Sequence, residues 1–292
     1  MRRDGYCDLH VHTNRSDAMS PWSPEAVILR AKSMGITHLG LSDHNVLNEE
    51  YMEQSEKYGI DVISSCEFSA DEEIDGVVGE YHVIGYRIDP FDPMVQALTE
   101  RSRQNRDGYL KAMLDGLELE NIHLTLEELK EHNPQSHHIG RVAIGEILIE
   151  RGYAKTMRQV YDAYLGRESG SPAYVPSKQY LKYPPLRDVV HGIIASGGLP
   201  ILAHIPYYGL DEIRQYKLLK RFQFYARQWA CMETEYGEYP PEVVLQQKQL
   251  AKTFGFVEST GSDFHGYEGL DLKQGDPGLY EKIQNHWEAV HL

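Results

Sequence analysis

Strand-like and helix-like segments alternate in the first third of this 292-residue chain and again in its last third. The predicted strands are hydrophobic runs bounded by polar residues or glycine, and they cover residues 6–12, 36–44, 60–69, 80–88, 197–206, 228–237 and 256–266. Helices are predicted between several of them, at residues 24–35, 48–59 and 241–255. This alternation is typical of parallel strands joined by crossover helices. We therefore expect an α/β fold with about seven strands.

The middle of the chain has a different character. Residues 93–178 are mostly helical in pattern and have little strand character before residue 172. We interpret them as a helical cap that is inserted into a barrel domain formed by residues 1–92 and 179–292. A last short helix is expected within residues 275–292.

Charge and composition exclude several classes of protein. The formal net charge of −15 is the opposite of the basic surface that long duplex nucleic acid requires. No apolar run is long enough to span a bilayer, and the N-terminal residues lack a signal-peptide pattern. The three scattered cysteines, Cys7, Cys66 and Cys231, argue against a disulfide framework. We expect a cytoplasmic protein that does not bind membranes.

Histidines and acidic residues recur where the predicted strands end. His10 and His12 occupy alternate positions of the first strand, so their imidazoles point to the same face. The other members at or just after strand ends are Asp43, His44, Glu67, His204, Glu233, Asp263 and His265, and His82 lies within the fourth strand. The C-terminal ends of barrel strands form one rim, where active sites lie. Clustered imidazoles and carboxylates predict a metal site there. We expect the isolated histidines at 38, 123, 132, 191, 286 and 291 to be surface or capping residues.

Six stretches of the chain also carry a family resemblance. In order, "DLHVHTNRSD", "LSDHN", "CEFS", "YHVIGY", "LAHIP" and "GSDFHG" resemble the successive motifs of the PHP (polymerase and histidinol phosphatase) superfamily. Within it, the chain is most similar to stand-alone phosphoesterases with an inserted helical domain. The resemblance implies a distorted (β/α)7 TIM-like barrel with an inserted, mainly helical cap and three bound metal ions. Asn45 stands where this family usually has an aspartate.

The resemblance assigns a ligand set to the three metal ions. It implies that His10, His12, Glu67 and Asp263 hold the first ion, that Glu67 bridges to a second held by His82 and His204, and that Asp17, His44 and His265 hold the third. Mixed imidazole and carboxylate ligands favour Mn, Fe or Zn over Mg or Ca. Such a centre would attract phosphate and supply a metal-bound hydroxide for attack on a phosphate ester. Asp43 or Asp263 could provide the proton that the leaving alkoxide needs.

Specificity is expected to come from the cap. Its candidate substrate-binding residues are Arg103, Arg106, His138, Arg141 and Lys178. Tyr207 and Tyr208 could stack on a base, although a packing role fits them equally well.

Three functions are open at this point. The favoured one is a phosphoesterase that hydrolyses a phosphate monoester of a nucleotide, either a 3′,5′-bisphosphate or the end of a short oligonucleotide. A histidinol-phosphate-type phosphatase would share the metal site and differ in the cap. A non-catalytic metal-bound module that supports a partner is the alternative from a different class.

Overall fold

The computed structural model describes residues 5–19, 21–237, 239–267 and 271–292, and its strands form one curved sheet. The strands are hydrogen-bonded in chain order and comprise β1 (Tyr6–Val11), β2 (Ile36–Leu41), β3 (Asp61–Ile74), β4 (Val77–Tyr86), β5 (Leu199–Leu202), β6 (Cys231–Tyr236) and β7 (Val257–Gly261). The first and last strands meet: the backbone amide of His12 donates to Phe264 O at 3.0 Å, and that of Asp263 to His10 O at 2.8 Å. The sheet is therefore a nearly closed barrel, and the predicted TIM-like fold is confirmed.

The direction of the fourth strand corrects one expectation. β4 runs antiparallel to both β3 and β5, whereas the other neighbouring pairs are parallel. β3 also continues to Ile74, well beyond the predicted end at residue 69. The cause is the turn at Asp75 and Gly76, which both have positive φ angles of 54° and 79°. An Asp-Gly pair in this conformation makes a tight hairpin, so no crossover helix is needed between β3 and β4.

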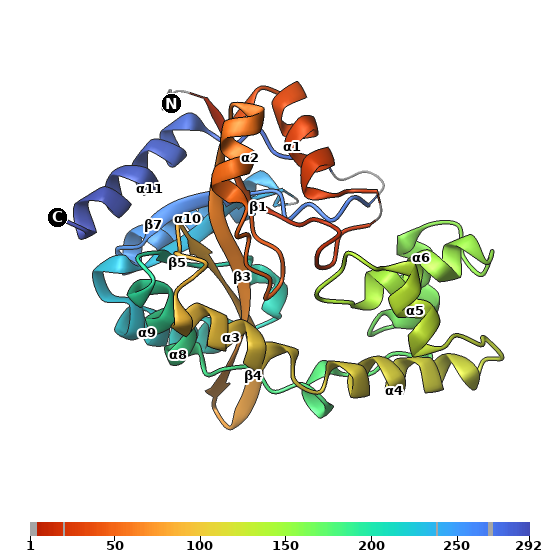
Figure 1. Ribbon diagram of the computed structural model, residues 1–292. Coiled ribbons are helices and arrows are strands. Elements are labelled where there is room, and N and C mark those ends of the chain that lie inside the picture. The colour runs from red at the N-terminus through yellow and green to blue at the C-terminus, as the bar shows by residue number, and fades with distance from the viewer. Residues whose placement is uncertain (1–4, 20, 238, 268–270) are drawn as a thin grey trace.

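Helices surround the barrel on its outer side (Figure 1). Those that flank the strands are α1 (Pro24–Ser33), α2 (Tyr51–Tyr58), α3 (Pro93–Arg103), α8 (Leu186–Ala195), α9 (Glu212–Ala226), α10 (Pro241–Phe254) and α11 (Pro277–Val290). Short 3-10 helices follow β5 and α9, at η3 (Ile205–Tyr208) and η4 (Arg227–Trp229). The largest hydrophobic cluster joins β3, β4, β5 and β6 to α3, α8, α9 and α10. No described helix is both long and apolar enough to cross a bilayer.

The remaining helices form a separate layer. They are α4 (Arg106–Glu118), α5 (Leu126–His132), α6 (Arg141–Glu150), α7 (Met157–Val160), the π-helical turn η1 (Tyr161–Leu165) and the 3-10 turn η2 (Ser177–Gln179). Figure 1 shows α4, α5 and α6 to one side of the barrel. Their hydrophobic cluster is independent of the barrel core, and its fully buried members run from Tyr109 to Tyr183. By contrast, Val95 and Leu98 of α3 pack in the barrel core. The insertion limits of 93 and 178 stay a prediction.

His38 departs from the surface position predicted for it. Its side chain is buried, its ring stacks on Tyr280 at 3.6 Å, and its Nδ1 lies 3.3 Å from Asp61 Oδ2. Arg87 also donates to Asp61 Oδ2, at 2.6 Å. Burial alone would raise the pKa of Asp61, but His38 and Arg87 lower it to about 2. This buried network ties β2, β3 and β4 to the C-terminal helix α11, at the end of the barrel opposite the rim.

Candidate metal centre

The ends of β1 and β7 bring two histidines and one aspartate together. The Nε2 atoms of His10 and His12 lie 3.2 Å apart, and His12 Nε2 lies 2.9 Å from Asp263 Oδ1. His10 Nε2 is 3.2 Å from the same carboxylate oxygen. Asp263 has a φ of 55°, an unusual conformation for a residue other than glycine. The backbone thus turns sharply after β7 and places this carboxylate over the strand ends.

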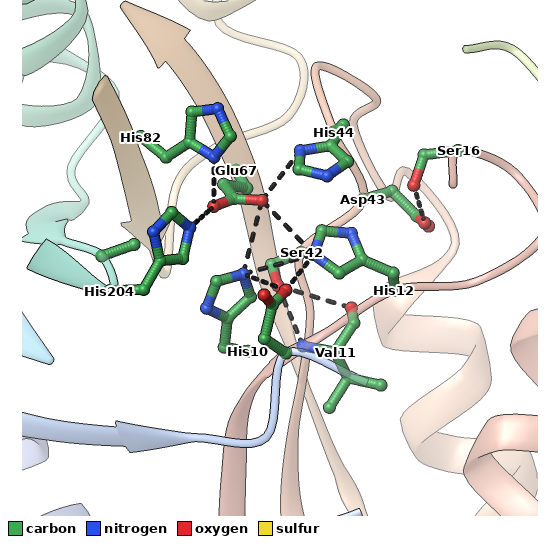
Figure 2. A network of polar contacts seen from close by, with 12 residues as sticks. His10, Val11, His12, Ser16, Ser42, Asp43, His44, Glu67, His82 and His204 are labelled. Atoms are coloured by element: carbon green, nitrogen blue, oxygen red, sulfur yellow. Dashed lines mark hydrogen bonds and ion pairs between the residues drawn. The ribbon is translucent and has the colours of Figure 1, made fainter. Parts of the chain in front are cut away.

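Glu67 of β3 lies at the middle of the cluster, as Figure 2 shows. Its Oε1 is 3.0 Å from both His82 Nδ1 and His204 Nε2. Its Oε2 is 2.8 Å from His44 Nδ1 and also lies near both imidazoles of β1, at 3.4 Å from His10 and 3.3 Å from His12. One fully buried carboxylate therefore faces five imidazoles.

A third group of ligand atoms lies toward the cap. The imidazoles of His12, His44 and His265 each offer a nitrogen within a common 4.8 Å. Asp17 is close by but belongs to none of the three tight groups of potential ligand atoms among the described residues. Its Oδ1 is buried and has no hydrogen-bond partner within the ranges that the structure describes. The structure thus brings together all nine side chains predicted as ligands, with Asp17 at the margin.

The electrostatics of the cluster favour bound positive charge. Burial disfavours protonated imidazoles, but Glu67 together with Glu80 raises the pKa of His82 to about 10. For His12, hydrogen bonds with Asp263 and Glu67 outweigh burial and raise the pKa to about 9. The pKa of Glu67 is held well below its usual value, because the imidazoles around it oppose the effect of burial. Metal ions satisfy the same demand for positive charge and displace the protons when they bind.

The donor set fits divalent transition metals. Three groups of imidazole and carboxylate atoms each lie within 4.8 Å: His10, His12, Glu67 and Asp263; His44, Glu67 and His82; and His12, His44 and His265. The Nε2 atoms of His10 and His12 are only 3.2 Å apart, and a cation bound between them would take the place of the proton that they share. Nitrogen-rich ligand sets suit Mn, Fe or Zn, whereas Mg and Ca prefer oxygen.

Several side chains that orient the ligands were not assigned a role from the sequence. Glu233 Oε1 lies 3.2 Å from His10 Nδ1, on the side of the ring away from the cluster, and Glu233 Oε2 accepts from the His204 backbone amide. The Tyr236 hydroxyl donates to Asp263 Oδ2 at 2.7 Å. Such partners fix the ring orientation of a ligand and increase its basicity. Glu233 stood out at a strand end, but no spacing in the sequence pairs it with His10, which is 223 residues away.

Asp43 lies outside the groups of potential ligand atoms. Its Oδ1 accepts from the Thr13 amide at 2.7 Å and from the Ser16 hydroxyl at 2.6 Å, and its Oδ2 accepts from the Thr13 hydroxyl at 2.7 Å. Figure 2 shows its carboxylate turned toward Ser16 rather than toward Glu67. These contacts hold Asp43 against the loop after β1 that carries Asp17.

Three of the predicted cap residues reach the rim. Arg106, His138 and Arg141 line a pocket of about 170 Å³ together with His44, His82 and Asp17. Among the described residues, one buried side-chain nitrogen of each of these cap residues has no hydrogen-bond partner: Nε of both arginines and Nδ1 of His138. Burial and the neighbouring arginine charge lower the pKa of His138 well below its usual value. The two unpaired guanidinium donors lie beside the cluster, and such donors can bind an anion.

The other two predicted substrate residues are placed differently. Arg103 donates to Asn45 O at 3.4 Å and lines a neighbouring pocket of about 640 Å³ with Arg15 and His137. Lys178 pairs with Asp71 and lies 3.9 Å from Glu80, and it does not line the pocket next to the metal cluster. The structure therefore does not bring Lys178 to the candidate anion site.

The fold and the site together define a class of protein, the metal-dependent hydrolases built on a TIM-like barrel. The family model for the PHP domain matches residues 8–227, and the chain belongs to this family. It is a metal-dependent phosphoesterase.

Relatives and solved structures are similar over almost the whole chain. A 5′-3′ exoribonuclease, Rnm, from Escherichia coli K12 is 30% identical over 290 residues, which cover 96% of this chain and 93% of that protein. A 3′,5′-nucleoside bisphosphate phosphatase from Chromobacterium violaceum is 28% identical over 288 residues, which cover 97% of this chain and 96% of that protein. The structure of an amidohydrolase from Chromobacterium violaceum, with bound sulfate and no metal, matches with a TM-score of 0.82 at 26% identity over 97% and 96% of the chains.

Proposed function

We propose that this protein hydrolyses a phosphate ester of a nucleotide that carries a second phosphate, either a nucleoside 3′,5′-bisphosphate or the 5′ end of a short RNA. The observation that carries the proposal is the pocket in which Arg106, His138 and Arg141 face His44 and His82. A cluster that binds one phosphate needs no further cations, so extra unpaired donors beside it favour a substrate with a second anionic group. The names of the two relatives, a bisphosphate phosphatase and an exoribonuclease, support the same class of substrate.

In this proposal the barrel supplies the chemistry and the cap holds the second phosphate. Bound divalent ions would polarise the phosphoryl oxygens and make water more acidic. The oxygen of water bonds to phosphorus, the ester P–O bond breaks, and the leaving oxygen gains a proton. Of the two predicted catalytic carboxylates, Asp263 alone faces the imidazoles, through Oδ1, while Tyr236 holds Oδ2. We assign Asp263 to take the proton of the attacking water and pass it to the leaving oxygen, and Asp43 to hold the loop that carries Asp17.

Phosphate release with added Mn²⁺ tests this function. The substrates are adenosine 3′,5′-bisphosphate, a short 5′-phosphorylated RNA, AMP, histidinol phosphate and p-nitrophenyl phosphate. We expect adenosine 3′,5′-bisphosphate and the 5′-phosphorylated RNA to have the highest specificity constants. Only these two carry a second anionic group, a phosphate or a phosphodiester, that can bind in the cap pocket. A preference for histidinol phosphate would indicate a small-molecule phosphatase, and no turnover on any substrate would favour the non-catalytic module.

Metal content is a second expected result. Protein purified without chelator should contain about three transition-metal ions per chain, because nine side chains converge at the rim. Mass spectrometry of the metals measures this number, and removal of the metals should lower the melting temperature. Less than one ion per chain after purification, with no thermal shift on adding Mn²⁺ or Zn²⁺, would contradict the assignment.

We place the protein in the cytoplasm, where thiols stay reduced. Cys7, Cys66 and Cys231 are all buried and none is in a disulfide. This pattern is typical of a reducing compartment.

A further inference from the structure

Three tyrosines lie together at the rim, on the side of the candidate metal cluster where His204 lies. Tyr207 comes from η3, directly after β5, whereas Tyr236 and Tyr239 come from the end of β6 and the loop that follows it. The ring centroids are 5.2 Å apart for Tyr207 and Tyr236, 4.9 Å for Tyr236 and Tyr239, and 6.1 Å for Tyr207 and Tyr239. We call these three residues the tyrosine group.

The group is connected to the metal cluster. The Tyr207 ring centroid is 6.5 Å from that of His204, and the Tyr236 ring centroid is 6.0 Å from it. The Tyr236 hydroxyl donates to Asp263 Oδ2, which fixes its ring next to a ligand. The position of this group is therefore set by the same strand ends that carry the ligands.

One ring of the group is open to solvent. Tyr207 is 56% exposed, although it packs against two other rings, and the rings of Tyr207 and Tyr239 are nearly parallel, with an interplanar angle of 24°. The Tyr239 hydroxyl is buried and has no hydrogen-bond partner among the described residues. Tyr208, which follows Tyr207 in the chain, differs from the tyrosine group. Its hydroxyl bonds to the backbones of His82 and Ala203, and its ring packs against Tyr81.

The tyrosine group and the cap pocket occupy different sides of the cluster. The cap pocket lies next to His44, whose ring centroid is 5.9 Å from that of His138. The tyrosine group lies next to His204, and Figure 2 shows His204 and His44 on opposite sides of Glu67. A substrate that spans the cluster would therefore meet donors for a phosphate at one end and aromatic rings at the other.

We propose that the tyrosine group is the nucleobase site of this enzyme, with the exposed ring of Tyr207 stacking on the base. The inference rests on the proposed nucleotide phosphoesterase function and adds where the base binds. Stacking on an aromatic ring suits every base, since each has a π face, so this site favours nucleotides over simple phosphates without selecting one base strongly. Tyr208 is excluded from the role because its hydroxyl and ring are already engaged in packing.

A comparison of two substrates tests the base site. They are adenosine 3′,5′-bisphosphate and an abasic analogue that keeps the sugar and both phosphates. Tyr207→Ala should lower the specificity constant for the adenosine compound about 10- to 100-fold and leave the abasic compound unchanged, whereas Tyr207→Phe should retain most of the activity. Tyr216→Ala is the matched control, because Tyr216 is 53% exposed on α9, outside the tyrosine group, and its loss should affect neither substrate.

The outcomes separate this inference from the proposed function. If the wild-type enzyme hydrolyses both compounds equally well, or if Tyr207→Ala lowers both equally, the base site is refuted while the phosphoesterase function stands. If the wild-type enzyme hydrolyses neither compound, the proposed function fails and the base site fails with it. Only a loss confined to the compound that has a base supports the assignment.

Discussion

Replacing Glu67 by glutamine is expected to lower phosphate release by at least about a thousandfold, and to lower the metal content with it. Glutamine keeps the shape of the side chain but removes the charge that faces His82, His204 and His44 at 2.8–3.0 Å. Polarisation of phosphate by bound metal contributes several kcal/mol, and each 1.36 kcal/mol is about tenfold in rate. Initial rates at saturating Mn²⁺, together with mass spectrometry of the metals, measure both effects.

Asn45→Asp is the matched control for this prediction. Asn45 lies next to the cluster, is fully buried and bonds to Ser69 through both atoms of its amide. An aspartate could still accept the Ser69 amide and hydroxyl, so we expect a change of less than about tenfold. Comparable losses in Glu67→Gln and Asn45→Asp would show that Glu67 does not join two metal sites.

Replacing Arg141 by alanine is expected to discriminate between substrates with one and two phosphates. A charge-assisted contact is worth about 1.5–3 kcal/mol, so the specificity constant for a nucleoside 3′,5′-bisphosphate should fall about 10- to 150-fold. A generic monophosphate ester should be almost unaffected. The guanidinium donates to the Tyr109 hydroxyl at 2.6 Å and to Val175 O at 3.3 Å, and its Nε has no hydrogen-bond partner in the described part of the chain.

Two further variants make the Arg141 result interpretable. Arg158→Ala removes an arginine of the same cap that is 91% exposed, and it should change neither specificity constant. Arg141→Lys keeps the charge but loses the bidentate geometry, so it should restore only part of the activity. An equal loss on both substrates would place Arg141 at the reacting phosphate, and no loss on either would leave it a purely structural contact of Tyr109.

Much of the barrel could be predicted because its signals are local. A strand that ends in alternate histidines fixes which face those imidazoles share, and the C-terminal ends of neighbouring parallel strands lie at one rim. The sequence therefore predicts that His10, His12, His44 and Glu67 lie near one another, and their atoms lie within a few ångströms. Their roles as metal ligands stay predictions.

The parts that were missed depend on long-range pairing or on a turn that was overlooked. The Asp75-Gly76 pair is a hairpin signal in the sequence, but the predicted third strand ends at residue 69, before this turn. Thr13 and Ser16 donate to Asp43, and Lys178 pairs with Asp71. The spacing of these residues along the sequence does not predict either contact. Lys178 and Asp71 are 107 residues apart, and they meet where the segment that follows the cap helices packs beside β3, as the bridge between Asp71 and Pro185 also shows.

The contact between Gly140 and Asp17 has a consequence for how this enzyme could change its substrate. A methyl group on Gly140 would lie 2.6 Å from Asp17 Oδ1, so no larger residue fits there without moving that carboxylate. In the proposed function, the residues of the anion pocket come from α4, α6 and the segment before α6, whereas the predicted metal ligands come from barrel strands and their loops. Mutation could therefore remodel recognition in the cap while the predicted ligands stay in place. At position 140, a change meant for specificity would also displace Asp17, which is a predicted ligand.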